Sequence, residues 1–317
     1  MAKYMEFAGG PFGQVTVDRA AQVRDAGGKV FYVNPNVGSS AEDRNTPFPE
    51  VDEETCFSTH QKAIDACAAD RGDLIIVARG YEAVTATVNF NKQGISMIPQ
   101  TFGLNPRHMG EYFCIDFSTT TTEPAAVISK ACYIQGLGFH TGWAAAGSYQ
   151  VQMGDGTGGG VWAAHLKNCR FTDWGTGCDY GLRFRASSNC LVDHCSFEGN
   201  LDAGVRFVGG INFWTTATNN PTNNQISNCN FNYCTYSIVH TASVNHQGLR
   251  YGPGNYTTES GTKFLNSDSG RGSGIIFGNY FNTAVGTDTN DLSVDDLETA
   301  GIICAGNYYA DEERDDE

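Results

Sequence analysis

Four carboxylates in the second half of the chain have the residue type and spacing that could cleave a glycan. They are Asp173, Asp179, Glu198 and Asp202. A glycoside hydrolase places two carboxyl groups roughly 5 to 9.5 Å apart across the scissile bond, and a lyase needs a base together with a cation that neutralises charge. None of the four recurs at an equivalent position of a repeat. The alternative is therefore that they lie in exposed turns or salt bridges.

A second set of side chains could bind a partner or a glycan: Trp162, Arg183, Arg206 and Trp214. The first three fall in an alternating pattern that would project outward from the fold. Stacked arginines repel one another, so each needs an anion or an aromatic face nearby, and Glu198 and Asp202 could supply the anion. An oligomer interface and a sugar groove remain the functional alternatives, because Trp and Arg are enriched at interface hot spots.

The other chemistry-bearing residues predict no metal and no cofactor. The glycine-rich segment 154–160 lacks the Lys-Ser/Thr of a phosphate-binding loop, and no helix pattern follows it. His194 stands where the repeats have Asn168 and Asn228, which indicates a turn-stabilising role, and His240 falls on an inward position. The remaining histidines show no zinc-ligand spacing: His60, His108, His140, His165 and His246.

The elements that would position these residues are marked by a six-residue repeat. Its copies are Leu166–Phe171, Val192–Phe197, Ile226–Phe231, Ile276–Phe281 and Cys304–Tyr309. With Cys169, Cys195, Cys229, Asn279 and Asn307 as equivalent positions, the steps are 26, 34, 50 and 28 residues. A unit in the twenties, interrupted by insertions, indicates stacked units that are each too small to bury a core alone.

A second alternating pattern precedes the copies and predicts strands. We expect one set to point inward: Val161, Leu182, Val205, Ile238 and Ile275. We expect the next residues to point outward: Trp162, Arg183, Arg206, Val239 and Ile276. Parallel strands about 4.8 Å apart place each residue above its equivalent. The sequence therefore predicts an all-β fold, a right-handed parallel β-helix filled by Phe, Cys/Asn and aliphatic columns.

The N-terminal third carries Phe31-Tyr32-Val33, then a helix pattern with Ala63, Ile64 and Cys67 on its apolar face, then Gly72-Asp73 and Gly80-Tyr81 around an apolar strand. Residues 29–100 resemble in this the opening of the pectate-lyase-like β-helix superfamily. The resemblance implies a first strand, a helix that caps the open end of the solenoid, and a first rung. It is specific for fold and not for function, since members include lyases, hydrolases, phage tailspikes and inert virion parts.

We expect three segments along the chain. Residues 1–28 form an N-terminal arm or end plug, with a short helix that begins at Asp18 and ends at Gly27 or Gly28; residues 29–309 form the β-helix, with loop insertions at 209–224 and 241–271; residues 310–317 form an acidic tail. By resemblance, tailspikes carry larger domains on both sides of the β-helix, which disfavours a full tailspike.

Composition limits the partners. The formal charge of -15, from 35 acidic and 20 basic residues, disfavours nucleic acid and anionic membranes. No run of about 18 apolar residues and no apolar signal region occur, so we expect synthesis in a host cytoplasm without a signal peptide and no membrane insertion. Eleven cysteines, an odd number without a close CxxC pair, favour free buried thiols.

These observations predict a bacteriophage virion protein. We expect a homotrimeric β-helix that decorates the capsid or forms a spike on it, contacts the major capsid protein or another virion protein, and is not an enzyme. A host-surface polysaccharide is a further candidate ligand, which Trp214 and the Tyr-rich stretch 251–256 would bind. The alternative is a polysaccharide-degrading tailspike, lyase or hydrolase that uses the carboxylates named above.

Overall fold

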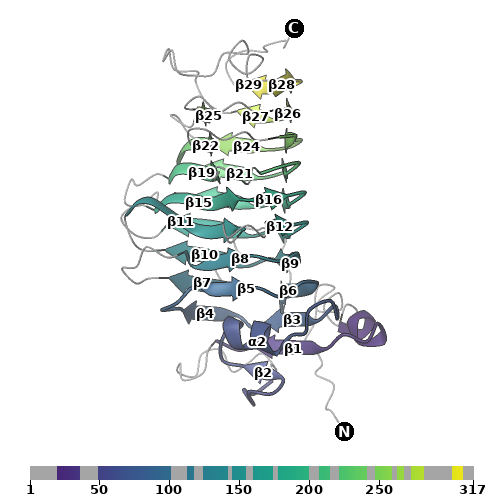
Figure 1. Cartoon of the computed structure of the whole chain (residues 1–317). Helices are drawn as coiled ribbons and strands as arrows, with labels where there is room; N and C mark the ends of the chain where they lie inside the picture. Colours follow the sequence, from purple (N-terminus) through teal and green to yellow (C-terminus); the bar gives the residue numbers. More distant parts are fainter. Residues whose placement is uncertain are drawn as a thin grey trace, which may run out of the picture.

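Short parallel strands stack coil upon coil along one axis in the computed structural model (Figure 1). The structure describes residues 20–35, 49–100, 113–117, 124–141, 145–154, 160–173, 178–199, 207–214, 221–240, 247–258, 263–267, 273–281 and 302–309. Each full coil contributes one strand to each of three sheets, here called A, B and C. This arrangement is a right-handed parallel β-helix and confirms the predicted fold class.

Sheet A has eleven strands, in the order β2 (Cys56–Phe57), β1 (Val30–Val33), β3 (Leu74–Val77), β6 (Ile95–Pro99), β9 (Cys132–Gln135), β13 (His165–Lys167), β17 (Leu191–Asp193), β20 (Gln225–Ser227), β23 (Leu249–Tyr251), β26 (Gly274–Phe277) and β28 (Ile302–Ala305). Sheet B has nine, β4 (Gly80–Ala83), β7 (Phe113–Phe117), β10 (Gly138–Thr141), β14 (Arg170–Asp173), β18 (Ser196–Glu198), β21 (Asn230–Asn232), β24 (Tyr256–Thr258), β27 (Tyr280–Phe281) and β29 (Tyr308–Tyr309).

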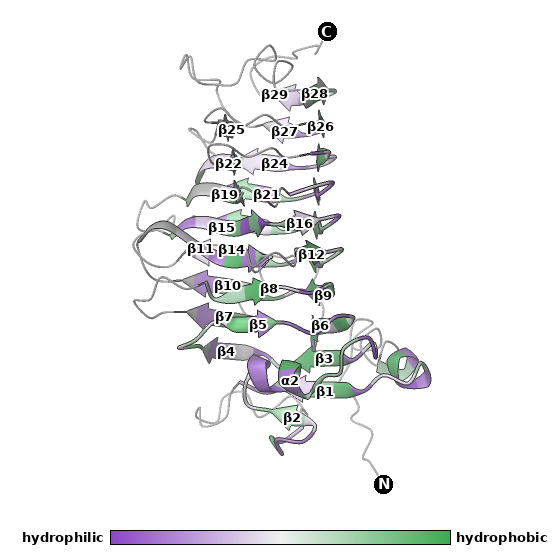
Figure 2. Cartoon of the chain, in the orientation of Figure 1, coloured by the Kyte–Doolittle hydropathy of each residue, from purple (hydrophilic) through white to green (hydrophobic). Residues whose placement is uncertain are grey.

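Sheet C has seven strands, in the order β5 (Val88–Phe90), β8 (Ala126–Ile128), β11 (Ala145–Met153), β15 (Cys178–Arg185), β19 (Phe207–Trp214), β22 (Cys234–His240) and β25 (Lys263–Ser267). A two-stranded sheet, β12 (Val161–Trp162) with β16 (Ser187–Ser188), lies in the chain between sheets C and A. The apolar residues that alternate along these strands fill the interior, and strands such as β3 and β8 are coloured hydrophobic in Figure 2.

Like side chains stack on like inside the solenoid, as the repeat predicts. Phe139, Phe171, Phe197 and Phe231 are paired in register on neighbouring strands of sheet B and are fully buried. The ring centroids of Phe171 and Phe197 are 4.6 Å apart and the planes are 3° from parallel. The stacked, close-packed rings bury a large apolar area in these four coils, and burial of apolar area stabilises the fold.

The corner between sheets A and B is a tight turn that repeats in the described coils from β9 onward. Asn168, His194 and Asn228 occupy it with φ of 51°, 53° and 54°, a left-handed backbone conformation that Asn tolerates better than most residues. Glycines take the same place at 254, 278 and 306. The turn role of His194 is thereby confirmed, and its Nδ1 lies 2.9 Å from Asp193 Oδ2.

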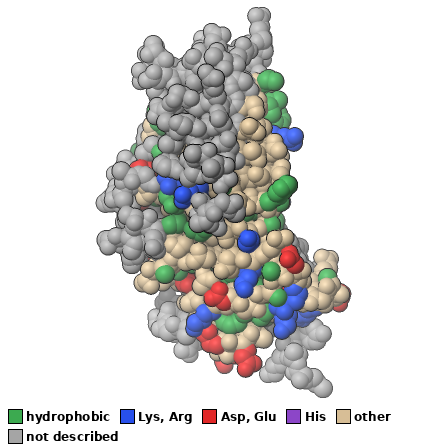
Figure 3. Space-filling view, viewed as in Figure 1, with side chains coloured by type: hydrophobic (Ala, Val, Ile, Leu, Met, Phe, Trp, Pro, Cys, Tyr) green, Lys and Arg blue, Asp and Glu red, His purple; other side chains and the backbone are tan. Residues whose placement is uncertain are grey.

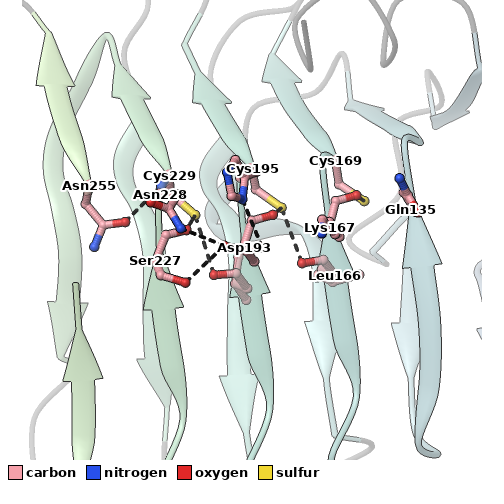
Figure 4. Close-up of polar contacts among 12 residues, drawn as sticks. Gln135, Leu166, Lys167, Cys169, Asp193, Cys195, Ser227, Asn228, Cys229 and Asn255 are labelled. Carbon is pink, nitrogen blue, oxygen red and sulfur yellow. Dashed lines mark hydrogen bonds and ion pairs between the residues drawn. The ribbon is translucent and has the colours of Figure 1, made fainter. Parts of the chain in front are cut away.

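The residue after this turn forms the Cys/Asn column, in which thiols and amides both hydrogen-bond to backbone groups of a neighbouring coil (Figure 4). Cys195 Sγ donates to the Leu166 carbonyl of the preceding coil at 3.7 Å, and Asn255 Nδ2 donates to the Ile226 carbonyl at 3.0 Å. The Asn255 side-chain oxygen also accepts from the Cys229 N–H at 2.9 Å. Each side chain therefore satisfies backbone groups that the turn removes from the strand ladder.

Helix α2 (His60–Ala66) covers the N-terminal end of the interior, as the resemblance implied. Thr59 caps it by accepting a hydrogen bond from the Lys62 N–H at 3.3 Å, and Ala63 and Ile64 belong to the buried core. Glu82 of β4 stands in register with Ile115, which pairs in turn with Phe139, and it accepts the His60 N–H at 2.6 Å. The cap is thus tied to the first strand of sheet B.

A helical turn over residues 20–25 lies on the outer face of sheet A, rather than over the end that α2 covers. Ala20 and Val23 pack against Ile76 and Ile98, which point away from the main core. Gly27 ends the turn with φ of 86°, as the sequence predicted. The remainder of the arm, residues 1–19, and the acidic tail 310–317 lie outside the described residues.

Both segments expected to be loop insertions contain strands. The 50-residue step hides a complete coil, because Asn255 continues the Cys/Asn column between Cys229 and Asn279. The six-residue repeat is not recognisable in this coil, because a large and a small side chain have changed places across the core. Thr257 stands in register with Phe231, while Tyr251 replaces the aliphatic residue opposite, is fully buried, and has its ring centroid 6.1 Å from that of Phe231. The core volume is kept while the pattern is lost.

The predicted inward and outward columns are wrong at several positions. Asn212 of β19, and not Arg206, pairs with Arg183, because the true equivalent of 181–184 is 210–213. Ile276 points inward, in register with Tyr251 and only 2% exposed, whereas Ile275 takes the outward position. Trp162 pairs with Ser188 in the small sheet, so it does not share a column with Arg183.

Candidate functional site

Glu198 is held in the scaffold by a buried ion pair on the outer face of sheet B. Its Oε2 accepts hydrogen bonds from Arg170 on the neighbouring strand, from Nη2 at 2.7 Å and from Nε at 3.1 Å. Its Oε1 accepts the Ser196 hydroxyl at 2.5 Å. The residue is 8% exposed. A carboxylate with this set of charge-assisted partners crosslinks two coils of the solenoid.

Asp173 and Asp179, the two other expected catalytic carboxylates that the structure describes, do not form an open pair with Glu198. Asp173 ends β14, is 1% exposed, and accepts the Cys178 N–H through Oδ2 at 2.7 Å. Glu198 pairs in register with Thr172, so Asp173 lies one residue further along its strand. Asp179 belongs to sheet C, where its N–H donates to Ser148 Oγ at 3.2 Å. Asp202 lies outside the described residues.

Arg183 is buried on the outer side of sheet C against aromatic rings. Its guanidinium carbon lies 3.7 Å from the Tyr149 ring centroid and 5.9 Å from that of Tyr180. Nε donates to Asn212 Oδ1 at 3.3 Å. Burial lowers the pKa of Arg183, and the tyrosines oppose that shift. The sequence predicted that the Arg183 guanidinium contacts either an anion or an aromatic face, and the described contacts include the aromatic face.

Two of the remaining candidates, Trp162 and Trp214, belong to described strands other than that of Arg183. Trp162 is 66% exposed on β12 and is the most exposed large hydrophobic residue of those described. Trp214 is the last residue of β19, where its backbone pairs with Arg185. Arg206 lies outside the described residues. The structure therefore does not bring the four binding candidates into one described cluster.

The surface feature that sequence reasoning missed is a column of outward-facing tyrosines on sheet B, of which the middle one is half-buried. Tyr256, Tyr280 and Tyr308 lie in register on β24, β27 and β29. Their ring centroids are 4.8 and 5.0 Å apart and their planes 11° and 13° from parallel. Tyr256 is 38% and Tyr308 48% exposed. We call these three residues the tyrosine ladder.

The sequence held a signal for this ladder. Each tyrosine directly follows a residue of the Cys/Asn column, so the pair Asn-Tyr recurs at 255–256, 279–280 and 307–308. A residue that follows an inward position in a strand points outward. The three pairs therefore predict one outward aromatic column, provided that the coil at 255 is recognised.

The buried cysteines are poor candidates for chemistry. Ten of them are buried without a disulfide partner in the part of the chain that the structure describes. Burial raises the pKa of Cys56 to about 12 and that of Cys190 to about 11. A thiol with so high a pKa stays protonated and is a weak nucleophile and metal ligand. The described residues also contain no group of three or more His, Cys, Asp or Glu side chains suited to a metal ion.

No described helix is long and apolar enough to cross a membrane. No protein-family model and no curated protein sequence matches the chain. Solved structures match it at the level of fold, and these structures share the parallel β-helix.

One such structure is ORF18 of Geobacillus virus E2, with a TM-score of 0.49 and 13% identity over 78% of this chain and 53% of that chain. The chain thus spans about half the length of that protein. Pectin methylesterase from carrot gives 0.46 and 12% over 89% and 82%, and Escherichia coli YbhC gives 0.47 and 11% over 89% and 84%. At these identities the likeness concerns the fold alone.

Proposed function

We propose that this chain is a structural protein of a virus particle, a homotrimeric β-helix that decorates the capsid or forms a spike on it. The observation that carries the proposal is the tyrosine ladder on a rigid solenoid. Exposed tyrosines are typical of surfaces that bind other macromolecules. The described carboxylates Asp173 and Glu198, in contrast, would have to leave buried hydrogen bonds before they could act on a substrate.

The assignment to a virus particle comes from the family resemblance of residues 29–100, since that superfamily includes virion parts. The likeness to ORF18 of Geobacillus virus E2 is one of fold and adds no argument of its own. The expected partners are two further copies of the chain and a capsid protein. A host-surface polysaccharide is a further proposed ligand, with Trp162 and Trp214 as the candidate contacts.

Mass spectrometry of purified particles, combined with a cleavage assay, tests this proposal against an enzyme. We expect the full chain to be present in particles, and we expect the purified chain to release no oligosaccharides from host-surface polysaccharides. Cleavage that is lost in Glu198→Gln while the fold persists would establish a depolymerase and overturn the structural assignment. Absence of the chain from particles would refute the virion role directly.

Glycan binding without cleavage is measured separately. A glycan array probed with the wild-type chain, Trp214→Ala and Trp162→Ala shows whether either tryptophan contacts sugar. Binding that is lost in one variant supports that residue as a contact. Wild-type protein that binds nothing on an array of the host's own surface polysaccharides removes the glycan from the proposal and leaves the structural role.

A further inference from the structure

We propose that the tyrosine ladder is the contact through which copies of this chain associate side by side around a common axis. The inference rests on the proposed homotrimer and names the surface that forms it. Tyr256, Tyr280 and Tyr308 stand one above the other, so the contact runs parallel to the long axis of the solenoid.

The ladder is not needed to complete the fold of a single chain. In earlier coils the same outward position holds Arg170, Ser196 and Asn230. Arg170 and Ser196 are buried and bonded to Glu198 within the chain. The later coils have a tyrosine at this position, although a serine or an asparagine is sufficient there in earlier coils. Exposed aromatic area that the scaffold does not require indicates a surface that is covered in an assembly.

The stacking of the rings decides which kind of partner fits. Because Tyr280 lies between Tyr256 and Tyr308 at 4.8 and 5.0 Å, its two faces are already covered. Edges and hydroxyl groups remain, at a spacing of one coil. A sugar ring stacks on an aromatic face, so the inner part of the ladder offers it little. A second copy presents edges and hydroxyls at the same period, and the two columns can meet coil by coil.

Charge favours the same surface. Each copy carries a formal charge of -15, so copies repel one another unless they meet where charge is low. The ladder and the neighbouring outward residue Asn230 are uncharged. Acidic and basic side chains lie close together over the N-terminal end of the solenoid in Figure 3, so this end presents charge to a neighbouring copy. Identical chains that associate mostly form closed, symmetric oligomers.

The test is the molar mass of the purified full chain, measured by light scattering during size-exclusion chromatography. The wild-type protein is expected at three times its chain mass of 34.2 kDa. The triple variant Tyr256→Ser, Tyr280→Ser, Tyr308→Ser is expected at a single chain mass. Serine is chosen because Ser196 occupies the equivalent position in an earlier coil. Trp162→Ser is the matched control, since it removes a more exposed aromatic residue from another sheet and should leave the trimer intact.

A second variant tests the same contact in case the triple variant does not fold. Tyr280→Glu changes one residue and places like charges opposite one another in the assembly, so it should also yield single chains with an unchanged far-UV circular dichroism spectrum. Trimers that persist in Tyr280→Glu and in a folded triple variant overturn the inference and leave the proposed function standing. A wild-type protein that is monomeric at micromolar concentration overturns both, and a trimer broken by Trp162→Ser alone moves the interface to that residue.

Discussion

Removing Arg170 should destabilise the solenoid far more than removing an exposed lysine. Arg170→Ala leaves the Glu198 carboxylate without its two bonds from the guanidinium, at a site where both side chains are 11% exposed. Breaking a buried ion pair from one side costs about 3–5 kcal/mol, because the remaining charge is desolvated and uncompensated. The Ser196 hydroxyl still donates to Glu198, which places the expected loss toward the lower end of that range.

The assay is urea unfolding followed by far-UV circular dichroism. Lys62→Ala is the control, because it breaks a pair of similar geometry, with Lys62 Nζ 3.0 Å from Glu53 Oε2, at a site where the two side chains are 53% and 42% exposed. We expect the urea midpoint to fall strongly in Arg170→Ala and to change little in the control, since solvent screens exposed pairs.

The double variant Arg170→Met, Glu198→Leu separates the ion pair from the burial of its side chains. Apolar residues of similar volume often replace a buried pair at little cost, so the double variant should recover much of the loss. A loss below about 1 kcal/mol in Arg170→Ala would contradict the reasoning. Glu198 would then have the freedom of an exposed group and would return as a catalytic candidate.

Three further predictions concern the cap and the columns. Burial raises the pKa of Glu82, but the contacts with His60 outweigh it and hold the pKa below its usual value, so stability that is present above pH 4.5 should be lost as the pH falls below it. Urea midpoints measured between pH 3 and 7 should therefore depend less steeply on pH in Glu82→Gln than in the wild-type protein. Asn255→Ala leaves the Cys229 N–H and the Ile226 carbonyl without side-chain partners and should cost about 1–3 kcal/mol, whereas Asn255→Cys should cost less, and equal losses by urea unfolding would refute the equivalence of thiol and amide. Phe197→Ala should cost about 3–5 kcal/mol by opening a cavity between two stacked rings, and a loss as small as that of a surface substitution would contradict the continuous column.

The fold could be predicted because successive coils repeat the same pattern of residue types. The phenylalanine column and the turn before Cys169, Cys195 and Cys229 can be found from spacing alone, since stacked coils repeat the same local conformation. The coil at 249–258 was missed because Tyr251 and Thr257 exchange size across the core. A search for repeated residue types assumes that each column keeps its own type in every coil. Packing requires only that the side chains that meet in the core together fill the same volume.

The candidate site was less predictable because it depends on register between strands. Val205-Arg206-Phe207 imitates Leu182-Arg183-Phe184, yet the pairing partner of Arg183 is Asn212, six residues later. The ion pair of Arg170 with Glu198 likewise joins residues that are not opposite one another, since Arg170 pairs in register with Ser196. Side-chain reach between coils is not visible in the sequence, so carboxylates that looked available for catalysis could not be recognised as structural.

The most direct test of the central claim is a cryo-EM reconstruction of the virus particle that carries this chain. We expect groups of three β-helices on the capsid, with Tyr256, Tyr280 and Tyr308 of each copy facing the threefold axis. Particles without this chain, or particles on which it stands as separate monomers with the tyrosine ladder exposed to solvent, would contradict it.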